Sequence, residues 1–63
     1  MIKTYELWDD DWHTLKWVCD TEEEADRAMQ YAQYVADTYG ELSTTEKWYE
    51  KGVWHIEVTY LDL

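Results

Sequence analysis

The sequence predicts an α+β fold in which one helix separates two β-hairpins, in the order ββαββ. Two stretches rich in β-branched and aromatic residues each surround a short polar turn, and an uninterrupted helical pattern lies between them. The chain has 63 residues, of which 46% are hydrophobic. A chain of this length has room for one core, so we expect residues 1–63 to form a single domain.

The first hairpin is predicted from residues 2–8 and 12–19, which carry the residue types that favour strands. Three consecutive aspartates separate the two stretches: Asp9, Asp10 and Asp11. Aspartate tolerates the left-handed backbone that short hairpin loops require. We therefore expect a three-residue loop that places Trp8 opposite Trp12 on the outer face of the hairpin.

The helix is predicted over residues 22–39. Thr21 and Glu24 have the spacing of a capping box, and Glu22 and Glu23 add negative charge where the helix dipole favours it. The apolar residues recur at helical spacing: Ala25, Ala28, Met29, Ala32, Val35, Ala36 and Tyr39. Gly40 is expected to end the helix in a left-handed conformation.

The second hairpin is predicted from residues 43–49 and 53–61. They flank Glu50, Lys51 and Gly52, a three-residue loop with glycine where a turn followed by a bulge requires it. This loop would place Trp48 opposite Trp54.

We expect a four-stranded mixed sheet with one helix packed across one face, because a chain this short can bury only one sheet face. Right-handed crossover favours the first and last strands as a parallel central pair, giving the strand order 2-1-4-3. The chain also contains the sequence TLK at residues 14–16, an alanine-rich helix ending at Gly40 and an aromatic final hairpin. In length and layout it resembles the immunoglobulin-binding domains of streptococcal protein G, a resemblance that implies the architecture alone.

The alternation of the strands predicts which residues face the helix: Tyr5, Leu7, Leu15, Trp17, Trp54, Ile56, Val58 and Tyr60. The opposite face would then expose seven large apolar residues: Ile2, Trp8, Trp12, Val18, Tyr49, Val53 and Leu61. A patch of this size is typical of an association surface. On the helix, Tyr31 is expected at the border of the apolar stripe and Tyr34 to point away from it.

The charge of the chain limits its partners. Fifteen acidic and five basic residues give a formal net charge of -10, which repels nucleic acid and anionic lipid and attracts basic surfaces. We expect no direct nucleic-acid binding and no membrane association. The lone Cys19 and the lack of a signal-peptide pattern favour the cytoplasm.

No pattern in the sequence predicts catalysis, a cofactor or a metal site. Neither Ser43 nor Cys19 has a histidine nearby that could activate it. Asp9, Asp11 and His13 alternate as metal ligands could, but a hairpin turn at these residues is incompatible with the extended run they would need. We therefore expect a protein that is not an enzyme and has no bound cofactor or metal.

The leading hypothesis is an acidic binding protein that inhibits or modulates a basic, nucleic-acid-handling protein. In size and charge it resembles the small acidic inhibitors made by bacteriophages, several of which imitate DNA. The predicted binding residues are Trp8, Asp9, Asp10, Asp11, Trp12, Glu22, Glu23, Glu24, Asp26, Tyr31 and Tyr34. One alternative is a scaffold module that self-associates, for example as a homodimer, through its open sheet face. The other is an immunoglobulin-binding or engineered domain with the protein G layout.

Overall fold

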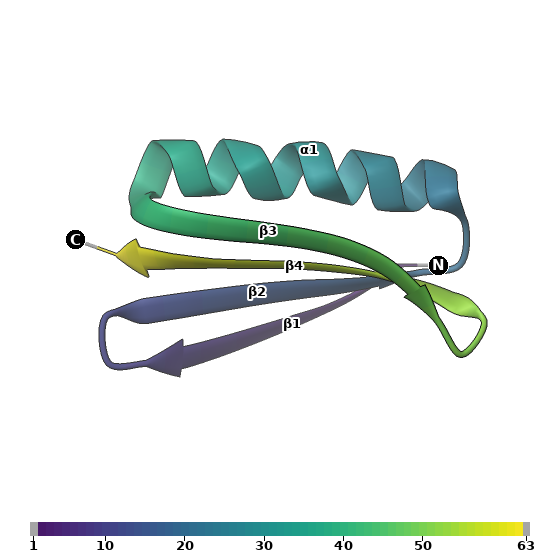
Figure 1. Ribbon diagram of the computed structural model, residues 1–63, viewed down its shortest axis with the longest axis horizontal. Helices are drawn as coiled ribbons and strands as arrows, with labels where there is room; N and C mark the ends of the chain where they lie inside the picture. The colour runs from purple at the N-terminus through teal and green to yellow at the C-terminus, as the bar shows by residue number, and fades with distance from the viewer. Residues whose placement is uncertain (1, 63) are drawn as a thin grey trace.

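The computed structural model describes residues 2–62 and contains one helix and four strands (Figure 1). In chain order they are β1 (Ile2–Asp9), β2 (Trp12–Cys19), α1 (Glu22–Tyr39), β3 (Gly40–Glu50) and β4 (Val53–Asp62). The strands form one sheet in the order β1-β2-β4-β3, and α1 packs on one side of it against β2, β3 and β4. The α+β class and the ββαββ order are confirmed.

The predicted strand order 2-1-4-3 is wrong, and so is the parallel central pair. Every neighbouring pair of strands is antiparallel, and β2 and β4 occupy the centre. Toward the helix β2 presents Leu15, Trp17 and Cys19, whereas the facing positions of β1 include Thr4 and Glu6. Burying the more apolar strand beside β4 removes more apolar surface from water, which favours the observed order. The layout therefore differs from the one that the resemblance to protein G implied.

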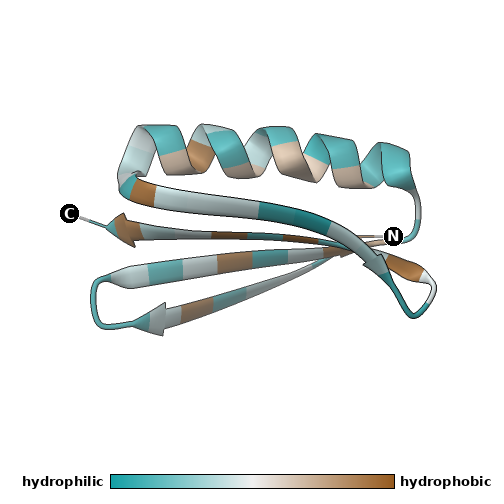
Figure 2. Cartoon of the chain, in the orientation of Figure 1, coloured by the Kyte–Doolittle hydropathy of each residue, from teal (hydrophilic) through white to brown (hydrophobic). Residues whose placement is uncertain are grey.

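Helix α1 has the predicted bounds. The Thr21 hydroxyl accepts a hydrogen bond from the Glu24 backbone N–H, and the Glu24 carboxylate accepts one from the Thr21 N–H, which completes the capping box. Its alanine-rich stripe is buried at Ala25, Ala28, Ala32, Val35 and Ala36. Figure 2 shows the more hydrophobic side of α1 turned toward the sheet.

Gly40 ends the helix for a different reason from the one expected. Its φ is -137°, so the backbone is extended and not left-handed. A Cβ atom at this position would overlap the ring of Tyr60. Gly40 is therefore required because the Tyr60 ring occupies the space that any side chain would fill.

Both hairpin loops are one residue shorter than predicted. The first consists of Asp10 and Asp11, with Asp10 at φ 54°, and the second of Lys51 and Gly52, at φ 53° and 81°. Two-residue loops with positive φ match the right-handed twist of the flanking strands, which favours them over three-residue loops. The bulge predicted at Gly52 is absent there, and the register of β3 on β4 shifts instead between Glu41 and Thr44.

The shorter loops change which face several side chains occupy, because strand residues alternate between faces. Trp8 is opposite His13 and not Trp12, so Ile2 and Trp8 lie on the helix side of β1, and Tyr5 and Leu7 lie on the open face. Tyr49 is opposite Trp54, on the helix side. The other core predictions are confirmed: Trp17, Ile56, Val58 and Tyr60 are buried, and Leu15 and Trp54 pack against them.

Candidate functional site

The predicted acidic binding residues are divided between the two ends of a molecule that is 34 Å long. Asp9, Asp10 and Asp11 lie at the β1–β2 turn, and the acidic first turn of α1 lies at the end where β3 turns into β4 (Figure 1). The structure therefore does not bring the two clusters together. A single contact surface can include one cluster or the other.

The cluster on α1 is paired with cations. Glu23 accepts a hydrogen bond from Arg27 at 2.8 Å. The Lys47 ammonium lies 2.6 Å from Asp26 and 3.2 Å from Glu22, and these hydrogen bonds, first with Asp26 and then with Glu22, raise the pKa of Lys47 above its usual value. Two cations among four carboxylates (Glu22, Glu23, Glu24 and Asp26) offset about half of the negative charge of this cluster.

The opposite end of the molecule carries carboxylates with no Lys or Arg among its described residues. We call it the acidic end, and it comprises the part of the sheet from the Glu6–Leu15 pair to the β1–β2 turn together with the C-terminal half of α1. Seven carboxylates lie in it: Glu6, Asp9, Asp10, Asp11, Asp37, Glu41 and Asp62. Within residues 2–62 all five basic residues lie in the other half, which we call the cation-bearing end: Lys3, Lys16, Arg27, Lys47 and Lys51.

Two features increase the negative potential of the acidic end. Its formal charge is -7 of the total of -10. The C-terminus of α1 also points to this end, and its last turn has no basic residue, so the negative pole of the helix dipole adds to the carboxylates. Potentials from like charges on one surface add, and they attract cationic surfaces over a distance.

A buried histidine holds strand β1 against the rest of the sheet. His13 is 6% exposed, and its ring stacks on Trp8 at 3.8 Å between centroids. Its Nδ1 is 2.6 Å from the Tyr60 hydroxyl and its Nε2 is 2.8 Å from Glu6. These contacts position Glu6 and Trp8, two residues of β1 that the helix does not bury.

The predicted aromatic residues do not form one cluster. Trp8 and Trp12 flank the same turn on opposite faces of the sheet, so the predicted pairing of Trp8 with Trp12 on the outer face is absent. Trp8 is 52% exposed and Trp12 39%. On α1, the Tyr31 ring lies edge-to-face with the Trp17 ring, with 6.0 Å between the ring centroids. Tyr31 and Tyr34 are both exposed.

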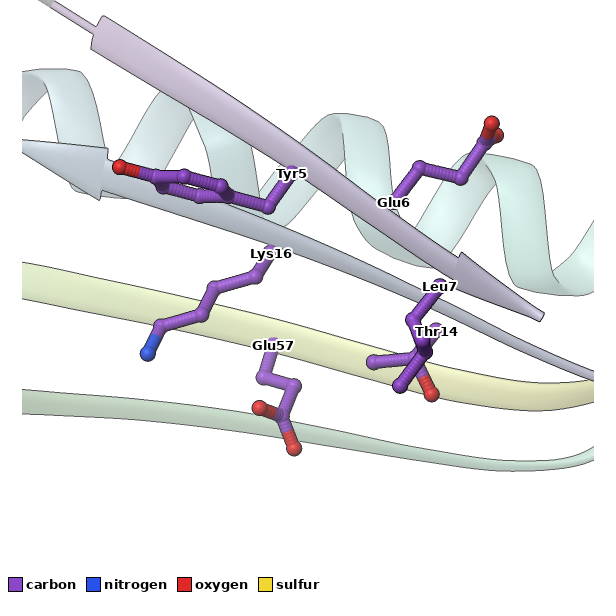
Figure 3. A pocket seen from close by; sticks show the side chains of 6 residues that line it. All are labelled: Tyr5, Glu6, Leu7, Thr14, Lys16 and Glu57. Carbon is purple, nitrogen blue, oxygen red and sulfur yellow. The ribbon is translucent and has the colours of Figure 1, made fainter. Parts of the chain in front are cut away.

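The open sheet face is more polar than predicted. Lys16 and Glu57 lie opposite each other on it, and Tyr5, Leu7 and Thr14 surround them to form a shallow hollow, with Glu6 at its rim (Figure 3). Lys16 also lies over the Trp48 ring, at 5.5 Å. In Figure 3 Glu6 extends from β1 away from the other side chains.

Asp9, His13 and Cys19, which the sequence offered as candidate reactive groups, do not form one site. Within residues 2–62 no group of three or more His, Cys, Asp or Glu side chains could hold a metal ion. Asp9 and His13 lie on opposite faces of the first hairpin. Cys19 is fully buried, and burial, followed by the charge of Glu24, raises the pKa of its thiol, which keeps it in the less reactive protonated form.

Comparison of the chain with protein-family models, with curated proteins and with solved structures found no match. Across residues 2–62, no helix combines the length and the apolar character needed to cross a membrane.

Sequence reasoning considered His13 only as a metal ligand, and it missed both the buried contacts of His13 and the concentration of negative charge at one end of the molecule. His13 alternates with Leu15, Trp17 and Cys19, so the period of two already indicates that it lies on the buried face. The charge polarity depends on which strand ends lie together, and it appears only when the chain is folded.

Proposed function

We propose that this protein is a non-catalytic binding protein whose acidic end binds a basic surface of a nucleic-acid-handling protein and so inhibits or modulates it. The observation that carries the proposal is the acidic end, with seven carboxylates and no Lys or Arg among its described residues. A protein surface that binds nucleic acid is rich in Lys and Arg, and it is therefore complementary to such an end. An occupant of that surface competes with the nucleic acid.

Binding of this kind would need contacts as well as charge. Trp8 and Trp12 are large, partly exposed rings on either side of the aspartate turn. Aromatic side chains are common anchors in protein interfaces, where they slow dissociation. The proposed site is therefore Asp9, Asp10 and Asp11 with Trp8 and Trp12 beside them. We place the activity in the cytoplasm, in keeping with the free thiol of Cys19.

A pair of charge-matched variants tests the proposal. One replaces Asp9, Asp10 and Asp11 with Asn. The control replaces three exposed carboxylates of the cation-bearing end with Gln: Glu23, Glu46 and Glu50. Both variants lose three negative charges, and the control also loses the exposed Glu23–Arg27 ion pair.

The parent and both variants are immobilised and exposed to bacterial lysate at low salt and at about 0.5 M salt, and the bound proteins are identified. We expect the parent and the control to retain a basic nucleic-acid-handling protein that salt releases. Once purified, the captured nucleic-acid-handling protein should release bound DNA in a mobility-shift assay when the parent chain is added. The Asn variant should associate more slowly and with a weaker salt dependence. Equal association rates for the two variants at low salt would contradict the proposal.

A further inference from the structure

The free edge of β1 is regular and uncovered, although it carries three charged residues, Lys3, Glu6 and Asp9. β1 pairs with β2 alone, keeps a regular register along all eight residues and contains no proline or bulge. Every residue of it is exposed, and four carry large apolar side chains that are 42–64% exposed: Ile2, Tyr5, Leu7 and Trp8. An edge of this kind is a template for another strand.

The other edge of the sheet is better protected. β3 packs against α1, and its register is interrupted between Glu41 and Thr44, beside Leu42 at φ 53°. Such an irregularity stops continuous pairing with a further strand. β1 is therefore the edge at which an added strand would fit.

The side chains of β1 complement a second β1 in antiparallel orientation. With Tyr5 of each copy on a two-fold axis normal to the sheet, Ile2 of one copy lies opposite Trp8 of the other, on the helix side. Lys3 then lies opposite Leu7, and Thr4 opposite Glu6. A shift by two residues in one direction places Glu6 opposite Glu6, and in the other direction places Ile2 opposite Glu6. The register centred on Tyr5 avoids both the pair of like charges and the pair of an apolar residue with a carboxylate.

The charge polarity of the molecule favours the same orientation. Antiparallel pairing places the acidic end of each copy beside the cation-bearing end of the other, with Lys3 of one copy diagonal to Asp9 of the other. Parallel pairing would place two acidic ends side by side. The orientation that satisfies the backbone is therefore also the one with the smaller electrostatic repulsion.

We propose that two copies of this chain associate through their β1 edges, antiparallel and centred on Tyr5, to form one continuous eight-stranded sheet. This dimer goes beyond the proposed function and does not depend on it. It leaves Asp10, Asp11 and Trp12 outside the paired strands, where they remain available to a basic partner, whereas Trp8 lies opposite Ile2 of the other copy.

Cysteine variants test the register. Opposite residues in a non-hydrogen-bonded antiparallel pair have Cβ atoms about 4.5–5.5 Å apart, close enough for a disulfide with small adjustments. Tyr5→Cys should therefore form a covalent dimer under mild oxidation. Lys3→Cys and Leu7→Cys should each remain monomeric alone, and a mixture of the two should yield the crosslinked heterodimer. Because Cys19 is fully buried, it should not contribute.

Glu46→Cys, on the opposite edge strand β3, is the control for random collision. If Tyr5→Cys crosslinks no faster than Glu46→Cys, the proposed dimer is wrong. Crosslinking of Lys3→Cys with itself in preference to Tyr5→Cys would also overturn the register.

Sedimentation equilibrium of the unmodified chain measures the association itself. Tyr5→Lys places two like charges at the axis and should weaken the dimer roughly tenfold or more. Tyr34→Lys introduces the same charge at a tyrosine on α1 with similar exposure, 59% against 54%, and should have little effect. A parent that stays monomeric, or equal effects of the two variants, would contradict the proposal.

Salt separates this proposal from the proposed function. Two chains of net charge -10 repel each other, so added salt should strengthen the dimer, whereas it should weaken binding to a basic partner. A salt-sensitive complex of the chain with a basic protein, but no dimer, would leave the proposed function standing alone. In another outcome, the chain captures the basic protein while remaining monomeric, with capture lost in Tyr5→Lys and retained in Tyr34→Lys. That result would show that the β1 edge binds the partner, and it would overturn the dimer.

Discussion

At the scale of single residues, His13 and Tyr60 explain how a sheet with one uncovered edge strand stays regular. Tyr60 is 3% exposed and its hydroxyl is hydrogen bonded to His13, which in turn contacts Glu6 and Trp8 of β1. The same ring of Tyr60 requires the glycine at position 40. A few buried polar contacts therefore connect β4, β2 and β1 at the acidic end.

The ionisation of Tyr60 should make stability depend on pH in the alkaline range. Burial, followed by the nearby carboxylates of Asp62 and Glu6, raises the pKa of this hydroxyl above its ordinary value of 10.0. The unfolded chain releases the proton at a lower pH than the folded chain does. The free energy of unfolding therefore keeps this contribution below about pH 10 and loses it as the pH rises further.

Urea unfolding at several values between about pH 9 and pH 11 measures this effect for the parent and for Tyr60→Phe. The variant lacks the ionisable group, so its free energy of unfolding should fall less steeply with pH. A decline of equal slope in both proteins would show that Tyr60 does not titrate as its burial indicates.

At the scale of elements, α1 supplies most of the small side chains that allow close approach to the sheet. Ala25 and Ala32 are fully buried, opposite the larger residues of β2 and β4. Close packing of this kind leaves no room for a larger or charged side chain. The phase of the helix can therefore be tested by substitution.

Ala32→Asp should lower the free energy of unfolding by about 3 kcal/mol or more, because it buries an unpaired carboxylate. Gln33→Asp, at the next and exposed position of α1, should change it by less than about 0.5 kcal/mol. Thermal denaturation followed by circular dichroism measures both. A similar loss in the two variants would mean that the helix is rotated relative to the described packing.

At the scale of the whole molecule, the gathering of carboxylates at the acidic end lowers the free energy of unfolding. Seven carboxylates gather at one end without a described Lys or Arg among them, and like charges brought together on folding repel. The acidic end is therefore a region where removal of charge should stabilise the fold.

Replacement of Asp9, Asp10 and Asp11 with Asn should raise the free energy of unfolding at low salt by about 0.5 kcal/mol more than the control substitutions at Glu23, Glu46 and Glu50. The control carboxylates lie in the half that holds the cations, so their loss removes attraction as well as repulsion. The salt-dependent part of the difference should disappear near 1 M salt, where charges are screened beyond about 3 Å. A difference that does not change with salt would exclude repulsion as its cause.

The elements of this fold were predictable because their signals are local. The capping box at Thr21 and Glu24 and the alanine-rich period of 3.6 determine the bounds of α1 without reference to the rest of the chain. The same holds for the existence of both hairpins, since turn residues and β-favouring residues are neighbours in sequence. The sequence by itself also determined the net charge and with it the expected class of partner.

Only the tertiary structure decided the register, the strand order and the composition of the candidate site. A loop of two residues instead of three differs by one position in sequence, yet it moves Trp8 and Tyr5 to opposite faces from those predicted, because alternation has a period of two. Strand order depends on which apolar faces are buried together, which is a property of the whole sheet. The acidic end exists because parts of all four strands and the C-terminus of α1 lie together there. These segments are distant in the sequence, so no local sequence pattern predicts that their carboxylates are neighbours.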